Sequence, residues 1–389
     1  MVSSVISDVR LTRFQFARDR VIGDSQVRIS DLNALAVELI AADGSVGLGF
    51  AQSLFTPFPD LSECKRVFRA EVWPGLEGKH PLALVHRIDR PRGGNQRGPS
   101  IGFGEAVQVA LWDLAAKQAG LPLWRMLGGQ RQKLRAYASG LDFHLSDKDF
   151  TELFGGAAAQ GFTAFKIKLG HTDFGRDLHR LDLLTQTVGR EAQIMVDANE
   201  AWGPKEAAMK IEAMRNAGFH PFWVEDPVLR NDIDGLRLLR SGVTGTLINS
   251  GEYLDLSGRR ALLQAGATDM LNVHGRITEV MQIGWLAAEM GVPVTMGNTF
   301  LEIGVHTGVA LPEVEWMEYS FQNYDHLVEE PIDIHDGYAH APDRPGHGLA
   351  LSDAARNLWS APVRLAEGSL PAAPGPSQLS NLPKYRARR

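Results

Sequence analysis

The feature that most constrains the fold is a series of short β-rich runs that recur at intervals of about 20 to 30 residues, most of them separated by amphipathic stretches. The eight runs cover 134–139, 163–169, 193–199, 221–227, 246–252, 268–274, 292–298 and 314–320. A strand, a helix and their turns need about 30 residues, so these units predict an α/β fold with a (β/α)8-type barrel. A doubly wound open sheet is the alternative, but no GxGxxG motif follows an early strand, which disfavours its nucleotide-binding form.

The segment before the barrel predicts a mixed structure. Residues 33–54 read as two strands joined at Asp43-Gly44, which is a strong hairpin signal. Residues 104–119 have helical periodicity, and Gly120 ends the pattern. Strands followed by a helix indicate an α+β domain.

These patterns divide the chain into four parts. We expect the α+β domain over 1–130, the barrel over 131–322, a return to the first domain over 323–368 and a tail over 369–389. The return segment consists of short strands and turns. The tail is rich in Pro and Ser, so we expect it to be mobile or to lie on the surface.

Composition excludes several classes of protein. The 389 residues carry 40 Lys and Arg against 46 Asp and Glu, and this net charge of -6 argues against a general nucleic-acid binder. Cys64 is the sole cysteine, which excludes a disulfide framework and a cysteine-built metal site. No apolar run approaches the ~18 residues that span a bilayer, and the N-terminus lacks a signal-peptide core. We therefore expect a soluble, cytoplasmic protein without a membrane partner.

Three acids stand at the ends of consecutive predicted strands. Asp197, Glu225 and Glu252 are 27 or 28 residues apart, and the C-terminal strand ends of a barrel carry its functional groups. Three gathered carboxylates repel one another unless a cation lies among them, and oxygen ligands favour Mg²⁺, with Mn²⁺ as the alternative. Asn199, two residues after Asp197, could orient a ligand or contact substrate, or it could simply form the turn.

Two lysines flank Ile167 on the second predicted strand. The strand period of two sends Lys166 and Lys168 to the same face. Burial, like charge and a neighbouring metal ion would each lower a lysine pKa, so we expect a neutral amine that serves as a base. The alternative is an exposed surface pair.

In combination these motifs resemble the enolase superfamily, in its mandelate racemase and muconate lactonizing enzyme-like branch. The order is Lys-x-Lys, Asp-x-Asn, Glu-Asp-Pro and Gly-Glu on strands two to five, and 110–129 and 342–349 resemble the branch's linker and C-terminal return. The resemblance implies a modified (β/α)7β barrel with an α+β capping domain, a small-molecule carboxylate substrate and a homo-oligomer. It also implies Mg²⁺ ligands at Asp197, Glu225 and Glu252, a base at Lys168, and support of the substrate carboxylate by Lys166.

The opposite face of the site departs from that family pattern. The branch has a His–Asp pair on strands seven and six, but here Asn298 takes the strand-seven position and His274 ends strand six. We interpret His274 as the best second acid, because imidazole donates protons near neutral pH, with a structural role as the alternative. Glu318 on strand eight matches the family's position for a group that hydrogen-bonds the substrate carboxylate. A burial-raised pKa would let Glu318 donate that bond. His306 is expected to be structural.

Two loops of the first domain, near 16–28 and 51–59, are expected to form the lid. Arg18 and Arg20 in the first loop, and His144 after strand one, could bind a polyhydroxy or dicarboxylate substrate. Solvent-exposed charges are the alternative interpretation for these three residues.

The predicted function is Mg²⁺-dependent removal of the proton α to a carboxylate, most simply in an acid-sugar dehydratase that forms a 2-keto-3-deoxy acid. One clear base suffices for elimination, whereas racemisation needs a base on each face. A racemase, epimerase or cycloisomerase using the same enediolate is the alternative enzyme. The alternative that is not an enzyme is a non-catalytic member of the family that retains the metal site.

Overall fold

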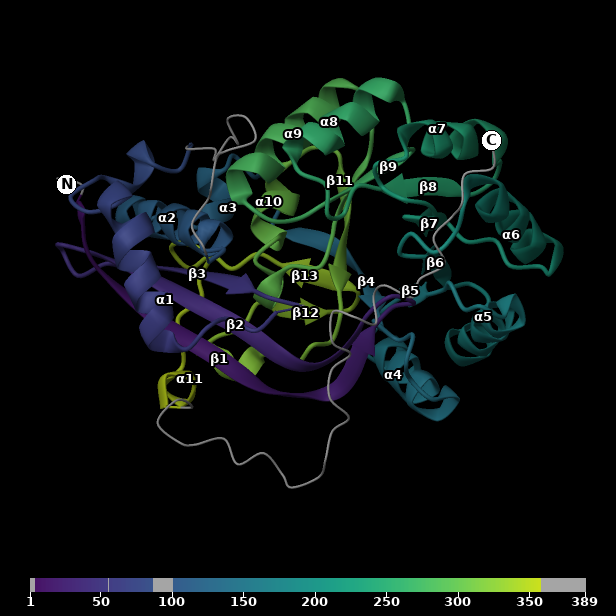
Figure 1. The fold of residues 1–389 in the computed structure, drawn as a ribbon, viewed down its shortest axis with the longest axis horizontal. Helices are drawn as coiled ribbons and strands as arrows, with labels where there is room; N and C mark the ends of the chain where they lie inside the picture. Colours follow the sequence, from purple (N-terminus) through teal and green to yellow (C-terminus); the bar gives the residue numbers. More distant parts are fainter. Residues whose placement is uncertain (1–3, 55, 87–100, 358–389) are drawn as a thin grey trace.

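The structure, a computed structural model, describes residues 4–54, 56–86 and 101–357. The predicted tail over 369–389 and the last part of the return segment lie outside these residues. A closed barrel dominates the fold (Figure 1). Its eight parallel strands are β4 (Lys133–Ser139), β5 (Ala164–Lys168), β6 (Gln193–Asp197), β7 (Trp223–Glu225), β8 (Leu247–Ser250), β9 (Met270–Val273), β10 (Val294–Met296) and β11 (Val314–Tyr319).

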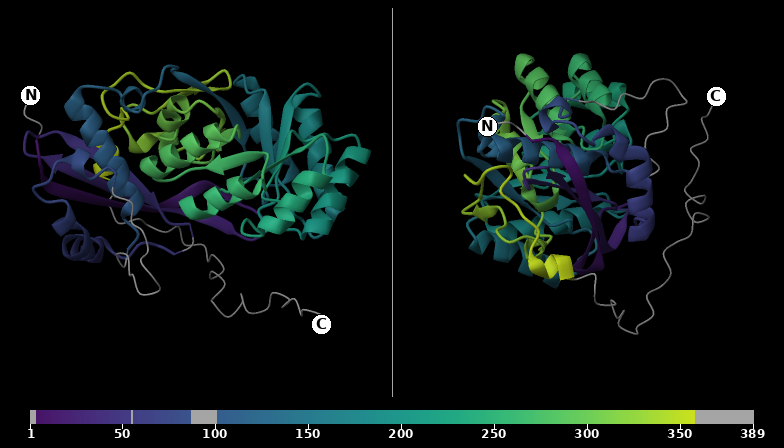
Figure 2. Two further views of the ribbon diagram at one scale, coloured as in Figure 1. Left: turned by 90° about the horizontal axis from the view of Figure 1, so that it is seen from above. Right: turned by 90° about the vertical axis from the view of Figure 1, so that its left-hand side faces the viewer.

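Seven helices connect these strands within the described residues 133–319. They are α4 (Asp147–Ala159), α5 (Phe174–Val188), α6 (Pro204–Asn216), α7 (Ile233–Gly242), α8 (Leu256–Ala265), α9 (Ile277–Glu289) and α10 (Val305–Ala310). The last strand, β11, pairs in parallel with β4 and closes the barrel. The helices lie on the outside of the strands (Figure 2). The predicted fold class is confirmed, as a (β/α)7β barrel with an additional N-terminal sheet.

The barrel interior is filled at the N-terminal half of the strands. The side chains that form this cluster are Tyr137, Ala164, Met195, Trp223, Met270 and Trp316. The ring centroids of Tyr137 and Trp223 are 5.3 Å apart, and those of Tyr137 and Trp316 are 6.4 Å apart. Large aromatic side chains close this end of the barrel, so polar chemistry is confined to the C-terminal strand ends.

The first domain is a three-stranded antiparallel sheet covered by helices. Its elements are β1 (Ile6–Gly23), β2 (Arg28–Ala41), β3 (Val46–Gln52), α1 (Leu61–Val67) and α2 (Gly104–Ala119), with short turns of helix at Phe68–Val72, Trp73–Gly75 and Pro81–Ala83. The predicted hairpin turn lies between β2 and β3. Helix α2 ends as expected at Gly120, which has a φ of 69°.

One expectation about the lid is wrong. The segment 16–28 was predicted as a loop, but residues up to Gly23 belong to β1 and only 24–27 connect it to β2. Cross-strand pairing, such as Phe16 with Leu32 and Ala17 with Asp31, holds this segment extended despite its charged composition. The other predicted lid, 51–59, begins with the last two residues of β3 and continues beyond the strand; its residue 55 lies outside the described part of the chain.

The chain leaves the barrel and then pairs with it again. After Asp325–Leu327, the hairpin of β12 (Asp333–His335) and β13 (Tyr338–His340) joins the edge of β4, so this part of the return packs on the barrel rather than on the first domain. The following loop does reach the first domain, where the backbone N–H of His347 donates to Oδ1 of Asp113 at 2.8 Å. The short helices α3 (Leu123–Met126) and α11 (Asp353–Asn357) and a turn of helix at Phe300–Glu302 complete the described elements.

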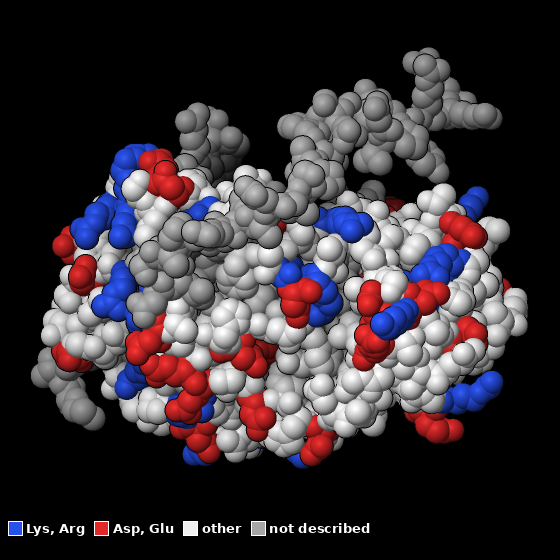
Figure 3. Space-filling model, turned by 90° about the horizontal axis from the view of Figure 1, so that it is seen from below, with Lys and Arg blue, Asp and Glu red and all other residues white. Residues whose placement is uncertain are grey.

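Two properties of the described surface bear on partners. None of the described helices is long and apolar enough to cross a membrane. On the face shown in Figure 3, acidic and basic side chains are interspersed, and its described part has no broad basic area of the kind that binds nucleic acids.

Candidate active site

The predicted acids meet at the C-terminal end of the barrel. Asp197 and Glu225 are the last residues of β6 and β7 and are direct partners in the parallel register. Glu252 follows β8 by two residues. All three are buried, with exposed fractions of 0%, 0% and 6%. The barrel topology therefore brings together side chains that are far apart in the sequence.

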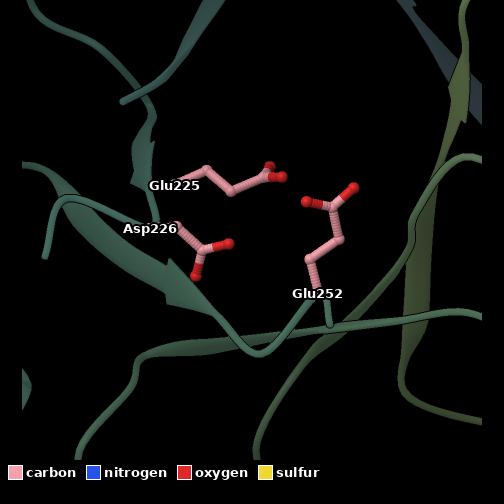
Figure 4. A group of neighbouring side chains, drawn as sticks. All are labelled: Glu225, Asp226 and Glu252. Carbon is pink, nitrogen blue, oxygen red and sulfur yellow. The ribbon is translucent and has the colours of Figure 1, made fainter. Parts of the chain in front are cut away.

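Asp226 is part of this cluster and was missed by the sequence analysis. Carboxylate oxygens of Glu225, Asp226 and Glu252 all lie within 4.8 Å of one another, and their side chains point toward a common centre (Figure 4). A strand alternates its side chains, so Asp226 would face away from Glu225 if β7 continued. Its φ of 37° ends the extended geometry and turns the carboxylate back. Its place in Glu-Asp-Pro was the one available signal.

Lys166 lies at the centre of the carboxylates. Its Nζ donates to Oε1 and Oε2 of Glu225 at 2.9 and 3.0 Å, and it lies 3.5 Å from Asp197 and 3.3 Å from Glu318. The amide of Asn272 also donates to Oε1 of Glu225, at 2.8 Å. Lys166 is 1% exposed, so the interpretation of a surface pair is wrong for this residue.

Lys168 lies beside the same cluster but has different partners. Its Nζ donates to Oδ2 of Asp197 at 2.6 Å and to the side-chain oxygen of Asn199 at 2.9 Å. Its backbone N–H donates to Oδ1 of the buried Asp142 at 3.1 Å. Asn199 has a φ of 43°, which is an uncommon backbone conformation, and it contacts both Lys168 and Asp197.

The expected lowering of the lysine pKa values is wrong for this structure. Burial alone would lower them, but Glu225 and Glu318 raise the pKa of Lys166 well above its usual value. For Lys168, Asp197 outweighs the effect of burial and of the neighbouring Lys166, and its pKa is also raised. The sequence reasoning counted burial, like charge and a neighbouring metal ion, and it omitted the direct carboxylate partners.

The donor set suits a divalent cation. Burial, together with the neighbouring Asp197, raises the pKa of Glu252 to about 7, and burial raises that of Glu225 well above its usual value. Despite burial, the two lysines lower the pKa of Asp197 to about 2. Buried carboxylates so close together are stabilised when positive charge lies among them, and an all-oxygen set is the kind that Mg²⁺ binds. The residues therefore fit the predicted metal.

Glu318 lies at the edge of the cluster as a charged acceptor. The backbone N–H of Asn298 donates to its Oε2 at 2.9 Å. We expected a burial-raised pKa, but Lys166 and Lys168 outweigh burial and lower it. The lowered pKa favours the charged form of Glu318, which accepts hydrogen bonds. The side-chain oxygen of Asn298 accepts from Ser320 at 3.0 Å.

His274 follows β9 at the opposite side of the barrel mouth. Burial, followed in size by the effect of Arg259, lowers its pKa to about 3, so the expectation of a protonated imidazole near neutral pH is wrong. Its Nε2 is buried without a hydrogen-bond partner. Arg259 donates to the backbone oxygens of Glu252 and His274 at 2.6 and 3.2 Å, which ties the loops after β8 and β9 together.

The two predicted substrate-binding arginines lie on β1 and contact protein groups. Arg18 donates to Gln322 at 2.7 Å and also to the hydroxyl of Tyr324. Arg20 donates to the backbone oxygens of Ser320 and Gly140 at 2.7 and 3.1 Å. Neither is a solvated surface charge. Both connect the first domain to the loops at the barrel mouth.

The turn between β1 and β2 also covers the barrel mouth. Its Gln26 side chain donates to the backbone oxygen of Asn199. Nε2 of His144, in the loop after β4, is 2.8 Å from the backbone oxygen of Val27. His144 therefore helps to hold this turn. Its contact with substrate stays a prediction.

Comparison with known proteins identifies the family. The family model described as "Enolase C-terminal domain-like" matches residues 149–355, which is more than half of the chain. The chain belongs to the enolase superfamily, in its mandelate racemase and muconate lactonizing enzyme-like branch. Enzymes of this superfamily use a Lys or His base with Mg²⁺ to form an enediolate.

Individual relatives cover nearly the whole chain. A candidate mandelate racemase from Mesorhizobium loti is 63% identical over 95% of this chain and 98% of its own, with a TM-score of 0.89. L-talarate dehydratase from Polaromonas sp. JS666, solved with Mg and L-glucarate, is 28% identical over 91% and 97%, with a TM-score of 0.79. The 3,6-anhydro-alpha-L-galactonate cycloisomerase of Streptomyces coelicolor is 28% identical over 85% of this chain and 92% of its own.

Proposed function

We propose that this protein is a Mg²⁺-dependent dehydratase of acid sugars that forms a 2-keto-3-deoxy acid. The observation that carries the proposal is the position of Lys168, whose buried ammonium is 2.6 Å from Asp197 at the edge of the acidic cluster. A base and a metal site side by side can remove the weakly acidic proton next to a carboxylate. L-talarate dehydratase among the relatives supports this reaction class.

The metal would be held by Asp197, Glu225 and Glu252, with Mg²⁺ favoured over Mn²⁺. Bound there, it would act as a Lewis acid that stabilises the negative charge developing on the substrate carboxylate. Lys166, between Glu225 and Glu318, would add a positive charge at the same carboxylate. Asn298 would contact the remainder of the substrate.

The proposed reaction has two bond-breaking steps. The neutral amine of Lys168 accepts the α-proton, and the C–H electron pair moves into the carboxylate as an enediolate. The β C–O bond then breaks, and the departing hydroxide takes up the proton held by the Lys168 ammonium and leaves as water. The resulting enol gains a proton at its β-carbon and loses its hydroxyl proton, which gives the keto acid. Asp197 is the partner that raises the Lys168 pKa, so engaging this carboxylate as a ligand would favour the neutral amine. His274, held neutral, could donate a hydrogen bond to the leaving group.

An epimerase or cycloisomerase is the second candidate, because relatives include a cycloisomerase. Such a reaction needs a second acid–base group across the substrate from Lys168. Strand β9, which faces that side, contains Met, Leu, Asn and Val but no lysine, and it is followed by His274. A lysine base on only one side of the substrate therefore favours elimination.

Incubation of the protein with Mg²⁺ and an acid-sugar library in D₂O tests the proposal. An α-keto acid product, detected by semicarbazide trapping and NMR, is the expected result. Deuterium exchange or isomerisation without a keto acid product would reject the dehydratase and support an epimerase or cycloisomerase. Bound Mg²⁺ with neither exchange nor turnover across the library would contradict both and favour a non-catalytic member.

A further inference from the structure

One arginine contacts three carboxylates beside the acidic cluster. The guanidinium of Arg230 has its Nε 2.6 Å from Oδ2 of Asp226, its Nη1 3.1 Å from Oε2 of Glu200 and its Nη2 3.4 Å from Oε2 of Glu252. The residue is 8% exposed. The Tyr253 ring centroid is 4.8 Å from its Cζ, so an aromatic face borders the guanidinium.

These contacts join three separate loops. Glu200 follows β6, Asp226 follows β7 and Glu252 follows β8, whereas Arg230 lies between β7 and α7. The backbone N–H of Arg230 also donates to Oε1 of Glu200 at 2.8 Å, so side chain and backbone bind the same loop. Glu200 and Asp226 both have positive φ values, 66° and 37°. Such conformations persist where surrounding contacts fix them.

The contacts also indicate different roles for Asp226 and Glu252. Asp226 bridges two groups, because Oδ1 accepts from the hydroxyl of Ser250 at 2.6 Å and Oδ2 accepts from Arg230. Arg230 contacts Oε2 of Glu252, which leaves the Oε1 atom for an ion. Asp226 therefore suits the role of a bridge between Arg230 and the cluster, and Glu252 that of a ligand.

We propose that Arg230 is a positioning residue of the metal site, where its planar guanidinium holds Glu252 in the orientation that binds the ion. The inference rests on the proposed metal site but does not depend on which substrate is used. Arg suits this role because its rigid fork can bond several carboxylates at once, whereas the ammonium of a lysine is a point charge. Mutation of groups that hold metal ligands by hydrogen bonds typically changes metal affinity 10–100-fold.

Positioning and simple charge balance predict opposite effects. A positive charge close to the site repels a divalent cation, so removing charge alone would tighten Mg²⁺ binding. If Arg230 orients Glu252, its removal would weaken binding although the repulsion disappears. The sign of the change in affinity therefore distinguishes the two roles without any measurement of activity.

The experiment is isothermal titration of Mg²⁺ alone into chelator-treated full-length protein. The variants are Arg230→Met, which keeps the apolar stem, and Arg230→Lys, which keeps the charge. Glu225→Gln, which removes a proposed ligand, is the positive control. Arg237→Met is the matched control, because Arg237 is exposed and contacts Asp234 on the same helix, 3.0 Å away. Thermal melting without added metal shows whether each variant is folded.

We expect Arg230→Met to raise the Mg²⁺ dissociation constant about tenfold or more, Arg230→Lys to fall between it and the wild type, and Arg237→Met to match the wild type. Unchanged or tighter binding by folded Arg230→Met would overturn the inference. If Arg230→Met is unfolded, weaker binding by folded Arg230→Lys supports the inference and wild-type affinity overturns it. Failure of the wild-type protein to bind Mg²⁺ would instead reject the metal site and with it the proposed function.

Discussion

At the scale of single residues, the lysine pair shows how one strand can supply two different groups. Lys166 and Lys168 lie on the same face of β5, yet Lys166 contacts Glu225 whereas Lys168 contacts Asp197 and Asn199. Lys166 lies deeper, among four carboxylate oxygens, and Lys168 lies nearer the end of the strand. The difference suits Lys166 for charge stabilisation and Lys168 for proton transfer.

The proposed base can be tested by exchange of the α-proton. We expect Lys168→Ala to reduce deuterium incorporation from D₂O by about 10³-fold, because general bases contribute roughly 10²–10⁴-fold. NMR of the substrate found in the library measures the rate. Lys148→Ala is the matched control, since Lys148 is exposed and 3.7 Å from Glu152 on α4. Wild-type exchange in the Lys168 variant would refute the assignment.

At the scale of elements, strand β3 packs on helix α2 through glycine. A Cβ atom built on Gly49 would lie 2.0 Å from the backbone oxygen of Ala106, and one built on Gly47 would lie 2.1 Å from that of Ala110. Real Cβ atoms never approach a backbone oxygen so closely. The helix can therefore lie against the strand only because these two positions lack side chains.

This packing predicts the effect of one methyl group. Gly49→Ala should lower the free energy of unfolding by about 2 kcal/mol or more, because overpacking of a rigid contact forces backbone shifts. Urea unfolding measures the change. The control is Gly156→Ala at an exposed position of α4, where the added Cβ meets no neighbouring group within 4 Å, and stability should rise by up to ~1 kcal/mol. Equal stability of the Gly49 variant and the wild type would show that α2 moves freely.

At the scale of the whole molecule, a buried histidine contact joins the barrel to the returning chain. His306 on α10, expected to be structural, has its Nε2 3.1 Å from the backbone oxygen of His347. The ring of His347 in turn has its Nε2 2.7 Å from the backbone oxygen of Leu48 on β3. Barrel, return segment and first domain thus meet at two buried imidazoles.

Acid should weaken this junction. Burial, with smaller effects of His347 and Arg344, lowers the pKa of His306 to about 3 against about 6.5 in the unfolded chain. Between these values the unfolded state binds more protons, so stability falls as the pH drops below 6.5. From pH 7.5 to 5.0 this one group should cost about 2 kcal/mol.

Urea unfolding of the wild type and of His306→Gln at both pH values tests this cost. The glutamine amide can still donate to the backbone oxygen of His347 but does not titrate, so the variant should lose about 2 kcal/mol less than the wild type. The exposed His335→Gln is the control. The same pH-dependent loss in the wild type and the His306 variant would contradict the assignment of His306.

Local patterns in the sequence determined the elements of this protein. Strand alternation and helix periodicity predicted all eight barrel strands, and the position of Asp197, Glu225 and Glu252 at strand ends predicted that they lie at one end of the barrel. These inferences succeed because side-chain direction in a strand depends on its own backbone, and parallel strands in a barrel end on the same side.

Only the tertiary structure decided the protonation of the site, the role of Asp226 and the partners of Arg18 and Arg20. The arginines bond to residues about 300 positions later in the chain, and Asp226 joins the cluster through one positive φ. The pKa of Lys168 rises because a carboxylate lies 2.6 Å away. Electrostatic energies depend on distances between groups remote in sequence, and only the folded chain sets those distances.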